Sequence, residues 1–139
     1  DFRLYTYGPF DSDVLDDLQY AEALGAVESR VNNYSGGKWY QYLPGPRIEE
    51  IASFATPFLS RHSDSVDWVL RNFGQRSAQD LEMASTLIFV DRAAFEGRSR
   101  QDIPELSRRV RAVKPYLSIE AIEREAQELK GNGLLSSVA

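Results

Sequence analysis

The sequence contains no cysteine, one methionine and a single histidine among its 139 residues. Without cysteine the chain has no disulfide scaffold, no thiol catalysis and no cysteine-ligated zinc. A single histidine also excludes any metal site that needs two histidines from one chain. A reducing compartment costs such a chain nothing, so we expect a cytoplasmic protein.

Long apolar runs are also absent. Among the longest is Ser85–Val90, far shorter than the roughly 20 residues that cross a bilayer, so no membrane span is predicted. Asp1–Tyr5 does not form a basic segment followed by an apolar stretch, and no signal peptide is expected. Hydrophobic residues make up 42% and charged residues 27%, which is typical of a globular domain.

Positive charge is in the minority, with 16 Lys and Arg against 21 Asp and Glu and a formal net charge of −5. A nucleic-acid role would therefore need a local basic patch that works against the field of the whole molecule.

The first part of the chain predicts a strand, a helix and a β-hairpin. Residues 2–7 alternate like a short strand, and Asp11 or Ser12 can cap a helix that Gly25 ends. Two short strands, 26–31 and 38–43, then flank a loop rich in Asn and Gly. A helix that runs directly into a hairpin has the order of a recognition helix and its wing.

The remaining chain predicts helices only. One begins at Arg47 and has a break or kink at Thr56, before Pro57, and another covers residues 66–73. The helix that Ser77 opens is apolar nearly all round, so we expect it to be the central buried element.

Two amphipathic helices, 103–113 and 119–130, then predict a second helix-turn-helix-like element at residues 101–135. The predicted fold class is therefore mainly α with a small β-hairpin, winged-helix-like, with two helix-turn-helix-like units sharing one core as a further possibility. We expect a winged-helix-like unit over residues 1–45 and a helical unit over 46–139 within one compact domain.

The opening segment resembles a known family. The stretch Leu4-Tyr5-Thr6-Tyr7-Gly8-Pro9-Phe10, followed by Val14, Asp17-Leu18 and Ala23-Leu24-Gly25, is similar to uncharacterised bacterial and archaeal proteins called YwgA-like. More distantly it resembles the Panacea (SocA-type) antitoxin domain, in which a Tyr-Gly-Pro element also precedes a helix. The resemblance implies a winged-helix-related fold and, on the Panacea side, binding to another protein; it implies no catalytic residues. In both families helices precede this element, so either the chain is a fragment or its later helices take that place.

No residue pattern predicts catalysis. His62 is close to Asp64 and Asp67, but this spacing spreads the three side chains around a helix. The chain has no Gly-x-Ser-x-Gly elbow, and Ser35-Gly36-Gly37-Lys38 lacks the spacing of a phosphate loop. We therefore predict a non-enzymatic protein without metal or cofactor.

The acidic helix and the aromatic hairpin favour a protein partner over DNA. Residues 1–45 contain seven acidic and three basic residues, a net charge of −4 that phosphates would repel. Alternation places Trp39 on one face of the hairpin and Tyr40 and Tyr42 on the other. Either one aromatic set is exposed, or Trp39 packs on the core and the tyrosines cover neighbouring helices. Exposed Trp and Tyr side chains are favoured interface anchors. The candidate interface residues are Asp13, Asp16, Asp17, Tyr34, Trp39, Tyr40 and Tyr42. We predict a protein-interaction or regulatory module that binds another protein or a second copy of itself.

The alternative is a DNA-binding transcriptional regulator that uses the basic helix near residues 108–114. Cations spaced along one helix face can contact phosphates, or the acidic groups of a partner. The candidate nucleic-acid contacts are Arg108, Arg109, Arg111 and Lys114.

Overall fold

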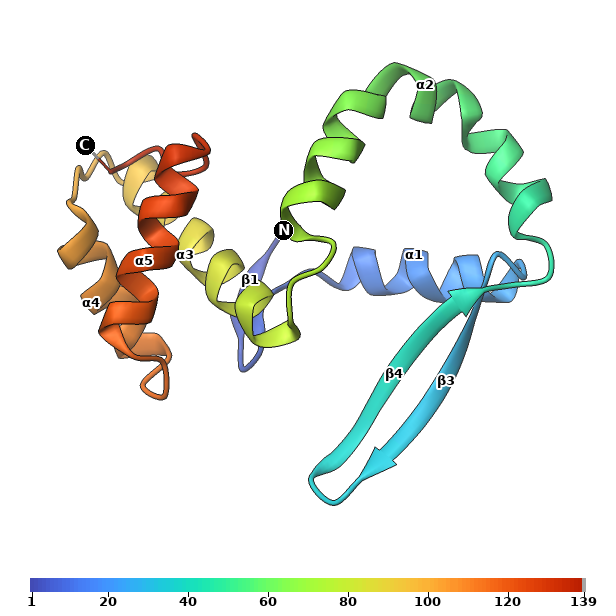
Figure 1. Ribbon diagram of the computed structural model, residues 1–139, viewed down its shortest axis with the longest axis horizontal. Coiled ribbons are helices and arrows are strands. Elements are labelled where there is room, and N and C mark those ends of the chain that lie inside the picture. The colour runs from blue at the N-terminus through green and yellow to red at the C-terminus, as the bar shows by residue number, and fades with distance from the viewer. Residues whose placement is uncertain (139) are drawn as a thin grey trace. The chain divides into compact units, whose positions relative to one another are not determined.

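The computed structural model describes residues 1–138, which form five helices and two antiparallel sheets of two strands each (Figure 1). The prediction of a mainly helical chain with a hairpin is confirmed. The chain divides into unit 1, made of Asp1–Phe10 and Gln75–Ala139, and unit 2, made of Asp11–Gly74. The predicted boundary at residue 45 and the single compact domain are therefore wrong, because the first residues pack with the C-terminal helices.

In unit 1, the chain opens with a tight hairpin where one strand was expected over residues 2–7. Strand β1 (Arg3–Tyr5) pairs with β2 (Gly8–Phe10), and Tyr5 lies opposite Gly8. Gly8 has a φ of +113°, which side chains with a Cβ rarely adopt. The glycine therefore allows the chain to reverse after Thr6 and Tyr7.

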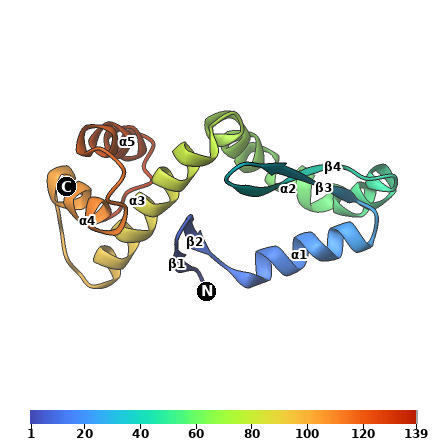
Figure 2. The same ribbon diagram turned by 90° about the horizontal axis from the view of Figure 1, so that it is seen from below.

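The core of unit 1 lies among α3 (Ala78–Glu96), α4 (Ile103–Val113) and α5 (Ile119–Gly131), which Figure 2 shows from a second side. Helix α3 contacts β2, α4 and α5, so its predicted central position in this unit is confirmed. The largest completely buried apolar side chains are Leu87, Leu106, Val110, Ile122 and Leu129. The predicted caps Ser77 and Ser118 accept hydrogen bonds from the amides of Asp80 and Ala121.

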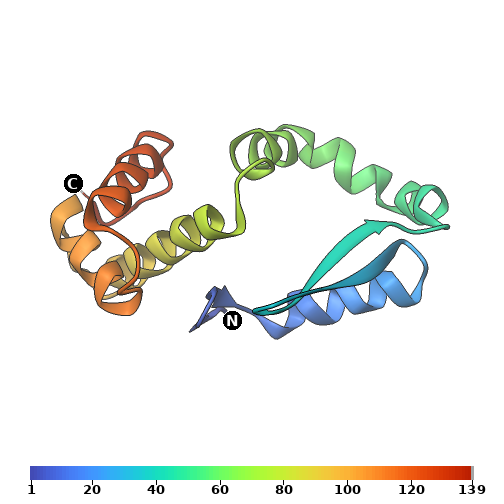
Figure 3. The same ribbon diagram turned by 60° about the horizontal axis from the view of Figure 1, so that its bottom comes forward.

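Unit 2 begins with α1 (Ser12–Ala23), whose cap Asp11 accepts a hydrogen bond from the Asp13 amide at 2.9 Å. The hairpin of β3 (Val27–Tyr34) and β4 (Gly37–Pro44) starts at the C-terminal end of α1 (Figure 3). Its strands pair as far as Tyr34 and Gly37, so the predicted six-residue loop is a two-residue turn. Strand pairing satisfies more backbone groups than the loop would.

Helix α2 (Ile48–Phe73) has a kink, as predicted, but the kink falls at His62 and the backbone stays helical at Thr56, where the break or kink was expected. Pro57 lies inside the helix, and the non-helical backbone falls at His62, with φ −116° and ψ 15°. Figure 1 shows that α2 bends along its length. The irregular residue lies five positions after Pro57, outside the turn whose hydrogen bond the proline removes, so two helical segments of α2 meet in a kink at His62.

Unit 2 has almost no buried core. Of its 64 residues, only Ala26 and Gly45 are buried, and both are small. Neither α1 nor α2 contains a buried residue. The apolar side chains of this unit therefore remain at the surface.

Candidate interaction surface

The hairpin of unit 2 exposes aromatic side chains on both of its faces. The register places Tyr40 opposite Val31 and Trp39 opposite Asn32, so the two aromatic residues lie on opposite faces, as the alternation predicts. Tyr34, Trp39, Tyr40 and Tyr42 are all exposed, with Trp39 at 49%. None of the four predicted aromatic candidates packs into a core.

The predicted acidic residues of α1 are exposed and lack cationic partners. Asp13, Asp16 and Asp17 form no ion pair with any residue between 1 and 138. Helix α1 contains no Arg or Lys, and Glu22 is engaged by Ser29, whose hydroxyl donates to it at 2.5 Å. The hydrogen bonds from the Ser29 hydroxyl and amide lower the pKa of Glu22. The negative field of α1 is therefore not neutralised within the described chain.

Helix α2 presents the longest apolar stripe of unit 2. Eight positions recur at alternating steps of four and three residues, the spacing of a coiled-coil seam. They are Ile48, Ala52, Ala55, Leu59, His62, Val66, Val69 and Phe73. None of them is buried, and Pro57 falls on the opposite side of the helix. The kink at His62 divides the stripe into an N-terminal and a C-terminal part, and no residue of either part is buried.

The predicted nucleic-acid contacts have different environments. Lys114 is 2% exposed, and its ammonium donates to Glu82 at 2.6 Å and to the carbonyl oxygens of Tyr5 and Thr6. All three of its donors are thus used inside unit 1. The prediction that Lys114 contacts phosphate is wrong, because reaching solvent would break a buried ion pair.

Two of the predicted arginines share one carboxylate. Arg108 and Arg109 both donate to Glu105, at 2.7 and 3.0 Å, and these hydrogen bonds lower the pKa of that carboxyl group. Arg111 is exposed and forms no ion pair with another described residue. Among the described residues, Arg111 is the exposed cation of the four without an ion pair, while Arg108 and Arg109 remain exposed and share one negative charge.

The structure also reveals polar residues that the sequence did not indicate. The hydroxyl of Tyr116 donates to Glu82, and this hydrogen bond is the main reason that the pKa of Tyr116 rises to about 12. Buried Asp91 accepts hydrogen bonds from the amides of Ser136 and Ser137 and so holds the C-terminal segment against α3. The only available signal was the position of Asp91 directly after an apolar run.

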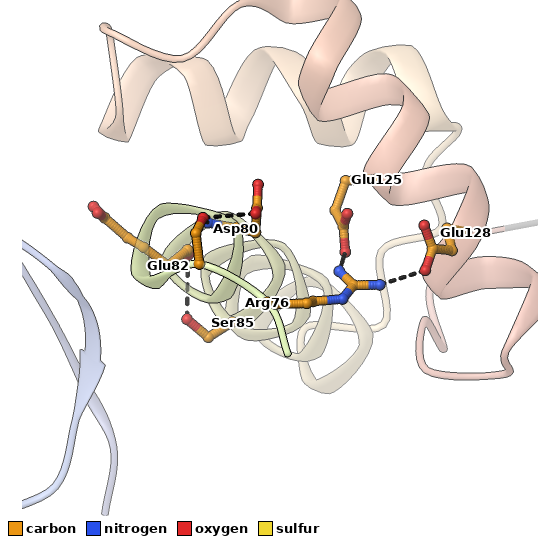
Figure 4. Close-up of polar contacts among 7 residues, drawn as sticks. Arg76, Asp80, Glu82, Ser85, Glu125 and Glu128 are labelled. Atoms are coloured by element: carbon orange, nitrogen blue, oxygen red, sulfur yellow. Dashed lines mark hydrogen bonds and ion pairs between the residues drawn. The ribbon is translucent and has the colours of Figure 1, made fainter. Parts of the chain in front are cut away.

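Arg76 lies just before α3 and links the start of that helix to α5. Figure 4 shows its guanidinium group between the carboxylates of Glu125 and Glu128 on α5, with ion pairs to both. Glu125 is 8% exposed, so this contact lies at the edge of the core. These polar groups all have internal partners, and their arrangement is that of structural anchors.

Within residues 1–138, no group of three His, Asp or Glu side chains is placed to hold a metal ion. No helix in the same range has the length and apolar character needed to span a bilayer. Comparison with protein-family models, with curated proteins and with solved structures gives no match to this chain. The resemblance to YwgA-like and Panacea proteins stays a prediction.

Proposed function

We propose that the chain is a non-enzymatic protein-interaction module whose docking surface is unit 2. The observation that supports this most directly is the absence of a core: 64 residues with only Ala26 and Gly45 buried. Folded domains of this size normally bury more than half of their chain's surface. A unit that leaves its apolar faces open is stabilised when another surface covers them.

The kinds of residue at this surface fit a protein partner. Aromatic side chains on the hairpin are the types enriched at the centres of protein interfaces. Phe54, Phe58 and Val69 on α2 are 78%, 60% and 50% exposed, and exposed apolar surface of this kind is typical of interaction sites. Burial of each such side chain would contribute about 1.5–3 kcal/mol at most.

In this proposal α1 and the β3–β4 hairpin form a winged-helix-like unit. Gly25, with a φ of +82°, turns the chain from α1 directly into β3, and Glu22 ties the helix to the strand through Ser29. The order of helix and wing is that of winged-helix proteins. The charge of α1 is opposite to that of a helix that enters a DNA groove, so the surface is better suited to a protein.

Photo-crosslinking in cells that naturally express the protein tests this proposal. A photoreactive phenylalanine replaces Tyr40 or Phe58 in unit 2, and Phe95 in unit 1 provides the control because its exposure, 57%, matches their 58% and 60%. We expect adducts with a protein from the two unit 2 positions and none from Phe95.

The same crosslinking variants also show which result would contradict the proposed function. Absence of an adduct at both Tyr40 and Phe58, together with a monomer in sedimentation velocity, would overturn the proposal. An adduct that disappears when Leu59 and Val69 are both replaced by serine would locate the contact on the α2 stripe.

A further inference from the structure

The apolar stripe of α1 lies open and has an acidic border. Val14, Leu15, Leu18 and Ala21 recur at steps of one, three and three residues and so share one side of the helix. Val14 is 60% and Leu15 is 38% exposed, so the N-terminal half of the stripe has no covering element. In a helix packed on its own domain these positions would be buried.

The contacts of α1 leave this half of the stripe free. Within unit 2 the main packing partner of α1 is β3, which is joined to the C-terminal turn of α1 by the hydrogen bonds between Ser29 and Glu22. Asp13 and Asp17 lie on the side of the helix next to Val14, where neither has an ion-pair partner. Apolar side chains and unneutralised carboxylates thus form one surface.

The charges of the two units indicate which kind of molecule can bind to the stripe of α1. Unit 2 contains ten acidic and five basic residues, a net charge of −5, whereas unit 1 contains eleven of each. A second copy that docked through unit 2 would place two negative surfaces within the Debye length of about 8 Å, where salt screens their repulsion only in part. A cationic partner instead gains from every exposed carboxylate of α1.

We infer that the acid-bordered stripe of α1 docks a basic amphipathic helix of another protein. This inference rests on the proposed function and names the chemistry of the partner. Such a helix places apolar residues at three- and four-residue steps against Val14, Leu15 and Leu18, and its lysines or arginines reach Asp13 and Asp17. Apolar contact supplies affinity, and charge supplies partner choice and speed of association.

A pair of labelled peptides tests the inference in the full-length chain. One is a helical peptide of leucine and lysine with leucines at three- and four-residue steps, and the other has glutamate in place of every lysine. Fluorescence anisotropy should show binding of the lysine peptide that weakens as salt is added, and no binding of the glutamate peptide.

Two matched double variants distinguish the effect of carboxylates next to the stripe of α1 from the effect of the total charge of unit 2. Asp13→Asn with Asp17→Asn should weaken binding of the lysine peptide about fivefold at low salt. Asp64→Asn with Asp67→Asn removes the same charge from α2 and should leave the affinity unchanged. Because all four side chains are exposed, none of these changes should unfold the chain, and circular dichroism checks this.

Replacement of the apolar side chains of the stripe should weaken binding of the lysine peptide more than loss of the two carboxylates. Val14→Ser with Leu15→Ser should reduce the affinity about thirtyfold, as expected for loss of buried interface anchors. Equal binding of both peptides, or equal effects of the two double aspartate variants, would overturn the inference. Concentration-dependent dimerisation that Val14→Ser abolishes would also overturn it in favour of a second copy, but would leave the proposed protein-interaction function intact. Loss of crosslinking at Tyr40 and Phe58 tests that function separately.

Discussion

Replacement of Lys114 by methionine should strongly destabilise unit 1. The change keeps the apolar stem but removes the ammonium group that pairs with Glu82 and satisfies the carbonyl oxygens of Tyr5 and Thr6. Side-chain exposures of 3% for Lys114 and 12% for Glu82 place the pair away from solvent. Breaking a buried ion pair by removal of one partner costs about 3–5 kcal/mol.

Amide hydrogen exchange is the appropriate assay for this effect. Both tryptophans, Trp39 and Trp68, lie in unit 2, so their fluorescence does not report on unit 1. The slowest amides of α3 and α4 should exchange about two to four orders of magnitude faster in Lys114→Met, since each 1.4 kcal/mol is tenfold. Glu82→Gln in the same chain should recover part of the loss, because it removes the unpaired buried charge.

Arg111→Met is the matched control. Arg111 lies in the last turn of α4, three residues before Lys114, and it is an exposed cation without an ion pair to a described residue. It should change the stability of unit 1 by less than about 0.5 kcal/mol. If Lys114→Met has an equally small effect, the Glu82 contact is not a buried anchor and our reasoning about Lys114 fails.

Three further predictions concern other parts of the chain. Gly45→Ala should destabilise unit 2 by about 1–3 kcal/mol, because the new Cβ would lie 2.4 Å from the Gly25 carbonyl oxygen, whereas Gly131→Ala, with no atom within 4 Å, should be nearly neutral; thermal melts of both variants decide this. Tyr116 should titrate at a pKa of about 12 by ring-carbon NMR, and at a lower pKa in Glu82→Gln. The stability that the hydrogen bond from Tyr116 to Glu82 contributes is complete below the ordinary tyrosine pKa of 10 and disappears as pH rises through the pKa of the folded state. Glu105→Gln releases Arg108 and Arg109, yet gel shifts on mixed DNA should show no salt-sensitive binding for this variant or for the parent chain; binding that appears in either would revive the DNA alternative.

Local signals predicted most of the helix boundaries. The caps at Ser77 and Ser118 were predicted correctly, and Asp11 is one of the two candidates given for α1, because each cap depends on one side chain and the first turn that follows it. Gly25 adopts the left-handed conformation expected after α1. The hairpin was also predicted, although its strands extend further into the Asn-Gly segment because pairing across the sheet outweighs turn preference.

The periodic spacing of apolar residues could not predict contacts between residues that are far apart in the sequence. The helical pattern placed Lys114 beside Arg111, but its partner Glu82 lies 32 residues earlier. Pro57 indicated a break or kink at Thr56, yet the irregular backbone falls at His62, which no local sequence signal marked. The open state of unit 2 could not be predicted either, since amphipathic patterns show that a face is apolar and not whether it is covered.

If unit 2 binds the partner proposed above, its lack of a core would make the abundance of the protein depend on that partner. Proteases cut segments that open locally, and a unit with only Ala26 and Gly45 buried has little to hold its backbone closed. A bound partner lowers the population of open chain in proportion to its occupancy. The lifetime of the protein in the cell should therefore rise and fall with the supply of that partner, and free chain should be removed first by cleavage between Asp11 and Gly74.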